Sequence, residues 1–200
     1  MKKAPLVLGI AGSPRRHGNS DLLLDAALRG AEEAGARTRR LIASAANLRP
    51  CLGCNACSLT GECVQRDGGP AVYAAIDEAD AIIVASPVFF ATVPGVLKVL
   101  YDRMQPYWAR RYVLKQPLAR RRPGGILLVR AGGDRFGFTG ASDATRSVFA
   151  VLGIDCLDEV LVEGADSAGE LANRTDVIAA AETLGREVAL EAERRLLVGG

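Results

Sequence analysis

Two kinds of hydrophobic pattern alternate along the chain. Short, nearly continuous apolar runs are typical of strands buried in a parallel sheet, and stretches with apolar residues three or four apart are typical of amphipathic helices. Strands are predicted at 6–11, 36–42, 81–85, 125–131 and 154–162. Helices are predicted at 21–34, 70–78, 95–105, 141–152 and 171–197. The run at 36–42 alternates weakly and carries charged residues, which favours an edge strand.

This alternation of strands and helices predicts an α/β protein with a doubly wound, five-stranded parallel sheet in a three-layer α/β/α arrangement. Right-handed crossovers, with the switch point beside the first strand, favour the flavodoxin-like strand order 2-1-3-4-5. Ligands of such sheets bind beyond the carboxyl ends of the strands at the switch point. The loops 12–19, 86–93 and 131–138 are predicted to meet there.

Two long segments interrupt the alternation. Residues 44–69 and 106–123 have neither helical nor strand periodicity. Long connections inside a compact domain are usually functional. We expect a single domain, 1–200, that carries 44–69 as a cysteine-bearing insertion and 106–123 as a basic insertion.

Composition narrows the class of protein. A formal net charge of +2 gives no case for nucleic acid as a ligand, and no apolar stretch reaches the length of a membrane span. Lys2 and Lys3 precede a first strand rather than the apolar core of a signal peptide. Five cysteines, four of them crowded between 51 and 63, argue against a secreted disulfide framework. We therefore expect a cytoplasmic protein.

The loop after the first strand has the chemistry of an anion site. It begins with Gly12-Ser13-Pro14-Arg15, and Asn19-Ser20 supplies helix N-cap chemistry before an apolar helix. Unpaired amides and the helix dipole converge at such a strand–loop–helix junction, so the loop is predicted to bind a phosphate group. The residues predicted to bind it are Ser13, Arg15, Gly18, Asn19 and Ser20.

Two other glycine motifs do not fit this loop. A P-loop has four residues between its glycines and then a lysine, whereas Gly12 and Gly18 enclose five and are followed by Asn19. A dinucleotide fingerprint needs Gly-x-Gly-x-x-Gly, which Gly9, Gly12 and Gly18 do not give. The interpretations left are a phosphate bound mainly by neutral donors, as flavodoxin-like folds bind FMN, and an ordinary strand-to-helix connection.

The clustered cysteines have the spacing Cys-x2-Cys-x2-Cys-x5-Cys, with Cys51, Cys54, Cys57 and Cys63 as its members. This spacing resembles ferredoxin-type thiolate runs and favours a [4Fe–4S] cluster, although Val64 stands where a proline would follow the fourth cysteine. Zinc is less favoured, because four-thiolate zinc sites usually come as two separated pairs. Free cysteines without a metal are the third interpretation.

Three segments carry a resemblance to a known family. The first is the predicted phosphate loop, Gly12-Ser13-Pro14-Arg15-x-x-Gly18-Asn19-Ser20. The second is Ala85-Ser86-Pro87-Val88-Phe89-Phe90 with Lys98 and Asp102-Arg103 after it, and the third is the cysteine run. Together, in this order over residues 5–165, they resemble the NAD(P)H-dependent FMN reductase family. The cysteine run is similar to the compact motif of the iron–sulfur flavoproteins within that family.

The resemblance implies that two further loops lie against a flavin. Apolar and aromatic side chains after the third strand would give the ring a flat, dry face, and glycines after the fourth strand would let backbone amides approach it. The residues implied are Pro87, Val88, Phe89, Phe90, Ala131, Gly132 and Gly133. Core or interface roles for the two phenylalanines, and a plain glycine turn, are the alternatives.

The function implied is that of an FMN-containing oxidoreductase. It would pass electrons from NAD(P)H or a protein donor through FMN to an acceptor, with the cluster as a one-electron port. We predict no proton-transferring catalytic residue, because the cofactor carries the chemistry. A flavodoxin-like electron carrier that does not oxidise NAD(P)H is the alternative.

Partners are implied in the same way. By analogy with the family, the helix after Pro94 packs in a homodimer or homotetramer, which Val93, Val96, Leu97 and Leu100 could support. A ferredoxin-like protein is the expected electron-transfer partner. A basic tract is predicted to form a solvent-exposed face, with a partner surface as the second interpretation. Its members are Arg103, Arg110, Arg111, Lys115, Arg120, Arg121 and Arg122.

Overall fold

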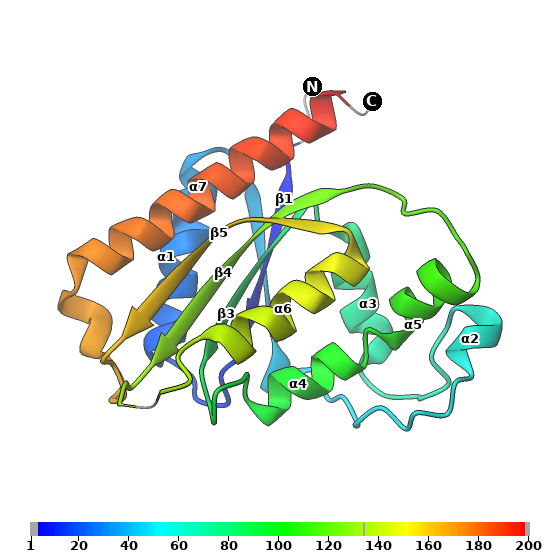
Figure 1. Ribbon diagram of the computed structural model, residues 1–200. Helices are drawn as coiled ribbons and strands as arrows, with labels where there is room; N and C mark the ends of the chain where they lie inside the picture. The colour runs from blue at the N-terminus through cyan, green and yellow to red at the C-terminus, as the bar shows by residue number, and fades with distance from the viewer. Residues whose placement is uncertain (1–3, 134, 199–200) are drawn as a thin grey trace.

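A parallel sheet forms the centre of the computed structural model, which describes residues 4–133 and 135–198. Its strands are β1 (Leu6–Ala11), β2 (Arg37–Ile42), β3 (Ala81–Pro87), β4 (Arg122–Arg130) and β5 (Ile154–Glu163). They lie in the order β2-β1-β3-β4-β5, and every neighbouring pair is parallel (Figure 1). The predicted fold class and strand order are therefore confirmed.

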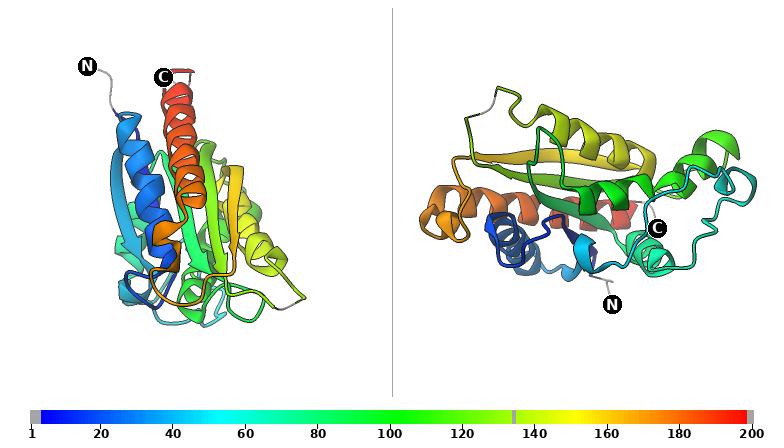
Figure 2. Two further views of the ribbon diagram at one scale, coloured as in Figure 1. Left: turned by 90° about the vertical axis from the view of Figure 1, so that its left-hand side faces the viewer. Right: turned by 90° about the horizontal axis from the view of Figure 1, so that it is seen from below.

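Helices cover both faces of the sheet (Figure 2). The longer ones are α1 (Asn19–Glu33), α3 (Gly69–Glu78), α4 (Gly95–Asp102), α6 (Thr139–Leu152) and α7 (Thr175–Val198). Shorter helical turns are η1 (Ala43–Ala45), α2 (Cys57–Thr60), α5 (Gln105–Trp108), the π-helical η2 (Ala109–Val113) and η3 (Glu170–Asn173). Leu24 of α1 and Val188 of α7 belong to the core on one face, whereas Ile76, Leu97 and Phe149 belong to the core on the other. Within the described residues, none of the helices combines the length and apolar character needed to cross a bilayer.

Close contact between α1 and α7 fixes the helix that carries the phosphate loop. A Cβ atom on Gly185 would collide with the carbonyl of Ala27, and one on Gly30 would collide with the carbonyl of Glu182. Glycine at these two positions lets the helix backbones touch. These contacts hold the second half of α1, from Ala27 onward, against α7.

The segment after α4 differs from the irregular insertion predicted at 106–123. It begins with α5 and η2, and β4 begins at Arg122 rather than at 125. Pro106 lies in the first turn of α5, where its missing N–H costs no helical hydrogen bond. Hydrophobic periodicity missed the start of β4 because Gly124 stands there and has no apolar side chain. Glycine is needed at this position, since a Cβ atom on it would collide with Ile154.

The prediction that the basic tract faces solvent is wrong for two of its members. The side chain of Arg103 is 1% exposed and pairs with Asp67, and Arg122 is 6% exposed. Arg122 donates hydrogen bonds to the carbonyls of Ile76 and Leu152. The tract has no acidic residue within it, but the fold brings hydrogen-bond acceptors to it from distant parts of the chain.

The helix predicted to support an oligomer turns most of its apolar residues inward. Val93, Leu97 and Leu100 belong to the core beneath α4, and each is buried within this chain. These side chains are therefore not available to a partner subunit, which corrects the expectation drawn from them. The oligomeric state itself remains a prediction.

Candidate functional site

A cavity of about 140 Å³ lies where the carboxyl ends of β1, β3 and β4 meet. Because β1 lies between β2 and β3, this edge is the switch point of the sheet. Predicted site residues that line the cavity are Ser13, Arg15, Gly18, Asn19, Ser20, Pro87, Val88, Phe89 and Ala131. The fold thus brings together residues from all three loops that were expected to meet.

The phosphate loop is shaped by hydrogen bonds between its own side chains and backbone. The hydroxyl of Ser13 accepts a hydrogen bond from the backbone N–H of Arg15 at 3.0 Å. The carboxylate of Asp21 accepts one from the N–H of His17 at 2.8 Å. Gly18 is the N-cap of α1, and no side chain caps the helix, so the predicted capping role of Asn19 and Ser20 is wrong. The first amides of α1 are free of intrahelical partners and can serve an anion.

Asn19 instead connects the phosphate loop to the segment that follows β5. Its side-chain amide donates to the carbonyl of Ser167 at 2.8 Å, and its oxygen accepts from the N–H of Leu171 at 3.3 Å. This contact brings Ala165, Asp166 and Ala168 into the wall of the cavity. Sequence reasoning missed these residues. The signal was present, because the small and polar segment 164–169 follows the carboxyl end of the fifth predicted strand.

Arg130 is a further wall residue that sequence reasoning did not single out. Its guanidinium forms an ion pair with Glu163 at 2.7 Å and lies 5.2 Å from the ring centroid of Phe138. It stands at the end of β4, so its charge borders the cavity at the switch point. The sequence places this arginine inside a predicted strand, where nothing marks it as functional.

The remaining predicted flavin residues lie outside the cavity wall. Phe90 is fully exposed at 103% with a left-handed backbone, φ 49°, and it follows Phe89, which lines the cavity and bridges to Thr92. Gly132 and Gly133 also have left-handed backbones, with φ of 107° and 83°. Their glycine character therefore has a conformational reason. Flavin contact by Phe90 and these two glycines stays a prediction.

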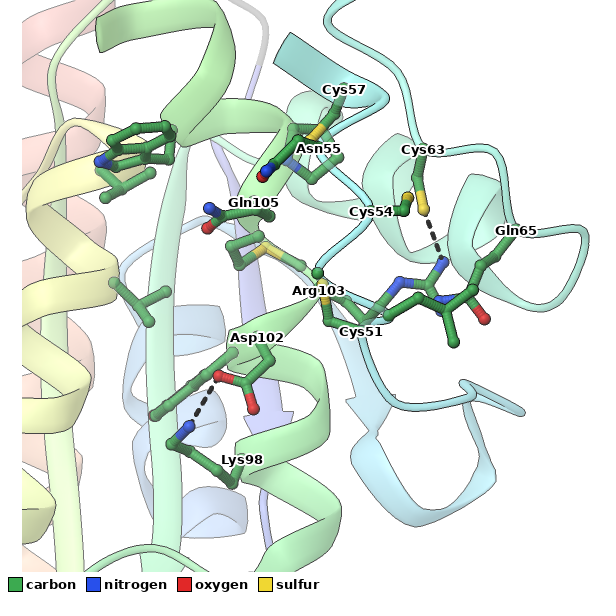
Figure 3. Close-up of a pocket in the computed structure, with 18 of the residues that line it drawn as sticks. Cys51, Cys54, Asn55, Cys57, Cys63, Gln65, Lys98, Asp102, Arg103 and Gln105 are labelled. Atoms are coloured by element: carbon green, nitrogen blue, oxygen red, sulfur yellow. Dashed lines mark hydrogen bonds and ion pairs between the residues drawn. The ribbon is translucent and has the colours of Figure 1, made fainter. Parts of the chain in front are cut away.

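A second and larger cavity, of about 550 Å³, is lined by all four clustered cysteines. Figure 3 shows them around it, together with α4 and α5. Gly53 and Asn55 on either side of Cys54 have left-handed backbones, which these two residue types tolerate. Cys57 is buried and Cys54 is exposed. Burial raises the pKa of the Cys57 thiol.

The cysteine loop is held against the fold by one buried ion pair. The guanidinium of Arg103, at the end of α4, donates to both carboxylate oxygens of Asp67, at 2.5 and 3.1 Å. It also donates to the carbonyl of Arg49 at 2.9 Å. A further hydrogen bond goes to Sγ of Cys63 at 3.5 Å, as Figure 3 shows. Asp67 accepts from the N–H groups of Arg49 and Gly69. The Arg103 guanidinium holds the pKa of the Asp67 carboxyl well below its usual range.

The donor set of this loop fits a cluster better than a single ion. Within the described residues, no group of three or more His, Cys, Asp or Glu side chains is arranged to hold one metal ion. A zinc ion would need four sulfurs around one point. In a [4Fe–4S] cluster each thiolate binds a different iron, so the sulfurs stand farther apart around a common space. Four thiols that line one cavity fit that requirement in their chemistry.

A five-stranded, doubly wound sheet with a cavity at its switch point, beside the start of α1, defines a flavodoxin-like protein. The cysteine-lined cavity sets it apart from a plain member of that class. The chain matches the family of NADPH-dependent FMN reductases over residues 5–166. It therefore belongs to that family.

Curated relatives are iron–sulfur flavoproteins of archaea. One from Archaeoglobus fulgidus is 39% identical over 125 residues, which cover 62% of this chain and 54% of the relative. One from Methanocaldococcus jannaschii is 42% identical over 100 residues, covering 50% and 52%. One from Methanosarcina thermophila is 36% identical over 131 residues, covering 66% and 65%. The chain spans about half the length of the first two.

Solved structures share the fold at low sequence identity. A flavone reductase aligns with a TM-score of 0.71 at 17% identity, over 94% of this chain and 63% of the other. An NAD(P)H:quinone oxidoreductase from Methanothermobacter marburgensis aligns with a TM-score of 0.65 at 19% identity, over 92% and 96%. These likenesses establish the fold alone.

Proposed function

We propose that this protein is an FMN-containing oxidoreductase that transfers electrons from NAD(P)H or a protein donor to an acceptor. The observation that carries the proposal is the cavity at the switch point, where Ser13–Ser20, Pro87–Phe89 and Ala131 meet. Membership of the NADPH-dependent FMN reductase family supports the same flavin. FMN supplies one- and two-electron transfer, and the chain supplies binding and electrostatics.

Different residues of the chain would bind the phosphate and the ring of FMN. The amides at the start of α1, with Ser13 and Ser20, would hold the phosphate. A cavity of about 140 Å³ is smaller than the 300–1,000 Å³ of ordinary ligand pockets, so part of the ring must lie outside it. Phe89 is the partly exposed apolar surface available there.

We propose further that Cys51, Cys54, Cys57 and Cys63 hold a [4Fe–4S] cluster. Their position around one cavity supports this, and so do the names of the iron–sulfur flavoprotein relatives. A cluster supplies one-electron transfer, which suits a ferredoxin-like partner. A homodimer or homotetramer in the cytoplasm completes the proposal, by analogy with the family.

The test is an absorbance spectrum of protein purified without oxygen, with iron and acid-labile sulfide counted per chain. We expect a two-banded flavin spectrum over a broad iron–sulfur shoulder and about four irons. The variant Cys54→Ser should lose iron and keep flavin, because Cys54 lies outside the switch-point cavity. Flavin without iron in the wild-type protein would exclude the cluster. A protein that binds no FMN would overturn the whole proposal.

The electron donor is tested separately. Anaerobic mixing with NADH or NADPH should bleach the flavin band if a nicotinamide is the donor. Bleaching only by a reduced ferredoxin would favour the electron-carrier alternative.

A further inference from the structure

We propose that Arg103 is a positioning residue of the iron–sulfur site, holding the Cys63 sulfur and raising the reduction potential of the cluster through a charge-assisted hydrogen bond. This inference rests on the cluster of the proposed function. It concerns a residue that binds neither flavin nor iron.

The first support is the contact itself. The guanidinium of Arg103 is 1% exposed, and one of its terminal nitrogens donates to Sγ of Cys63 at 3.5 Å. Hydrogen bonds to the sulfurs are among the factors that set the potential of an iron–sulfur cluster. Partners of this kind also orient metal ligands. Arg103 is thus placed where it can do both.

The second support is a donor that has no acceptor. Among the described residues, Nε of Arg103 is buried and has no hydrogen-bond partner. A buried N–H without a partner is costly, and native structures rarely keep one without a reason. The same guanidinium already directs one donor at a ligand sulfur. A sulfur of the bound cluster is the acceptor chemistry that would satisfy the spare N–H.

The charge of Asp67 provides a second change whose effect on the reduction potential should have the opposite sign. Its carboxylate is 4% exposed and neutralises most of the Arg103 charge at 2.5 Å. Removing Arg103 leaves a buried negative charge beside the cluster, which disfavours the added electron. Removing the charge of Asp67 leaves a buried positive charge, which favours it. The two changes should therefore move the potential in opposite directions.

A purely structural role for Arg103 predicts a different result. If the ion pair only fastened the loop, either change would loosen the loop in the same way, and the potential would not respond with opposite signs. Arg110 offers a matched control. Its Nε donates to the carbonyl of Gly61 in the same loop at 2.8 Å, and within the described residues it makes no hydrogen bond to a sulfur.

The experiment uses the full chain, reconstituted without oxygen with iron, sulfide and FMN. Arg103→Gln, Asp67→Asn and Arg110→Gln are compared with wild type by redox titration followed by electron paramagnetic resonance of the reduced cluster. At a fixed potential, Arg103→Gln should lower the ratio of reduced to oxidised cluster about tenfold, a shift of about 59 mV for one electron. Asp67→Asn should raise that ratio, and Arg110→Gln should change it less than twofold.

Arg103→Lys keeps the protein testable if Arg103→Gln does not fold. Lysine retains the charge near Asp67 but lacks the forked donors, so the potential should fall by less than in the glutamine variant. Loss of iron from Arg103→Gln, with circular dichroism and FMN content retained and iron kept in both Asp67→Asn and Arg110→Gln, would also support positioning. Equal shifts in the Arg103 and Arg110 variants, or none, overturn this inference alone. A wild-type protein without iron overturns it together with the proposed cluster.

Discussion

The switch-point cavity and the cysteine-lined cavity differ in what holds their walls. The first is built from the ends of β1, β3 and β4 and the start of α1, all regular elements of the sheet layer. The second is built from an irregular loop, 44–69, laid against α4, α5 and α6. Arg103 and Asp67 join that loop to the fold from positions far apart in the sequence.

Because of this difference, we expect mutations in the first site to affect ligand binding and mutations in the second to affect local folding. The sheet fixes the walls of the switch-point cavity, so small side-chain changes there should alter ligand binding before they alter folding. The cysteine loop leaves apolar side chains uncovered, since Leu52 and Leu59 on it are 70% and 82% exposed. It should open locally when its ion pair is lost, while the sheet stays folded.

Breaking that ion pair should have the largest effect. Asp67→Ala leaves the Arg103 guanidinium buried without its counter-charge, and removing one partner of a buried pair costs about 3–5 kcal/mol. Hydrogen exchange should show loss of protection across 44–69 with β1 and β3 still protected. Asp102→Ala is the matched control, because Asp102 forms an exposed pair with Lys98 worth about 0.3–0.5 kcal/mol. Equal effects of the two variants would contradict the contrast between the sites.

Acid should open the cysteine loop before the sheet. The folded pKa of Asp67 lies well below the value of about 3.9 for an unfolded aspartate. The carboxylate therefore contributes stability that is fully present above that value and is lost as the pH falls toward the folded pKa. Fluorescence of Trp108, which lines the cavity and is the single tryptophan, should change below about pH 4. This step should be absent in Asp67→Asn.

Asp155 provides the comparison for acid sensitivity away from the cavity. Hydrogen bonds from Arg121 and Arg195 lower its pKa to about 2. Asp155→Asn should change the pH midpoint of global acid unfolding. The Trp108 fluorescence change, which precedes global unfolding as the pH falls, should stay in place. A Trp108 change that follows Asp155 rather than Asp67 would show that the loop has no separate acid response.

A change in the switch-point cavity should act on ligand binding and by a smaller amount. Ser13→Ala removes the acceptor that orients the N–H of Arg15, a hydrogen bond worth about 1 kcal/mol. FMN binding, followed by fluorescence quenching, should weaken about fivefold with little change in thermal stability. Ser147→Ala, in the wall of the other cavity, should leave FMN binding unchanged. A Ser13 variant with unaltered affinity would remove this residue from the phosphate site.

The contrast also explains what the sequence could predict. Strand order and the meeting of Ser13, Val88 and Ala131 follow from hydrophobic period and crossover rules, because any parallel sheet brings the carboxyl ends of its strands to one edge. The partners of Arg103 do not follow from such rules. Its partner Asp67 lies 36 positions away at the end of an irregular loop, beyond α3, β3 and α4, and a basic tract alone suggested a solvent-exposed face.

Phe90 tests the switch-point edge with the smallest effect. Its side chain is fully exposed and its backbone is left-handed at φ 49°, a conformation that costs a non-glycine residue about 1–2 kcal/mol. Phe90→Gly removes that cost but gains unfolded-state entropy, so the free energy of unfolding without FMN should rise by at most about 1 kcal/mol. Leu59→Gly, similarly exposed but within the right-handed turn of α2, should instead lower it.

FMN affinity, measured on the same Phe90 variants, tests whether the strained residue contacts the flavin. If the ring of Phe90 covers the flavin, Phe90→Ala and Phe90→Gly should both weaken FMN binding by about two- to tenfold, the value of one aromatic contact. Urea unfolding without FMN would then report a gain, or no change, in the same variants that lose affinity. If Phe90 contacts the flavin, its strained backbone lowers stability in the free protein, and a variant that relieves the strain also loses FMN affinity. Unchanged affinity in both variants would leave Phe89 as the aromatic contact at this edge and remove Phe90 from the flavin site.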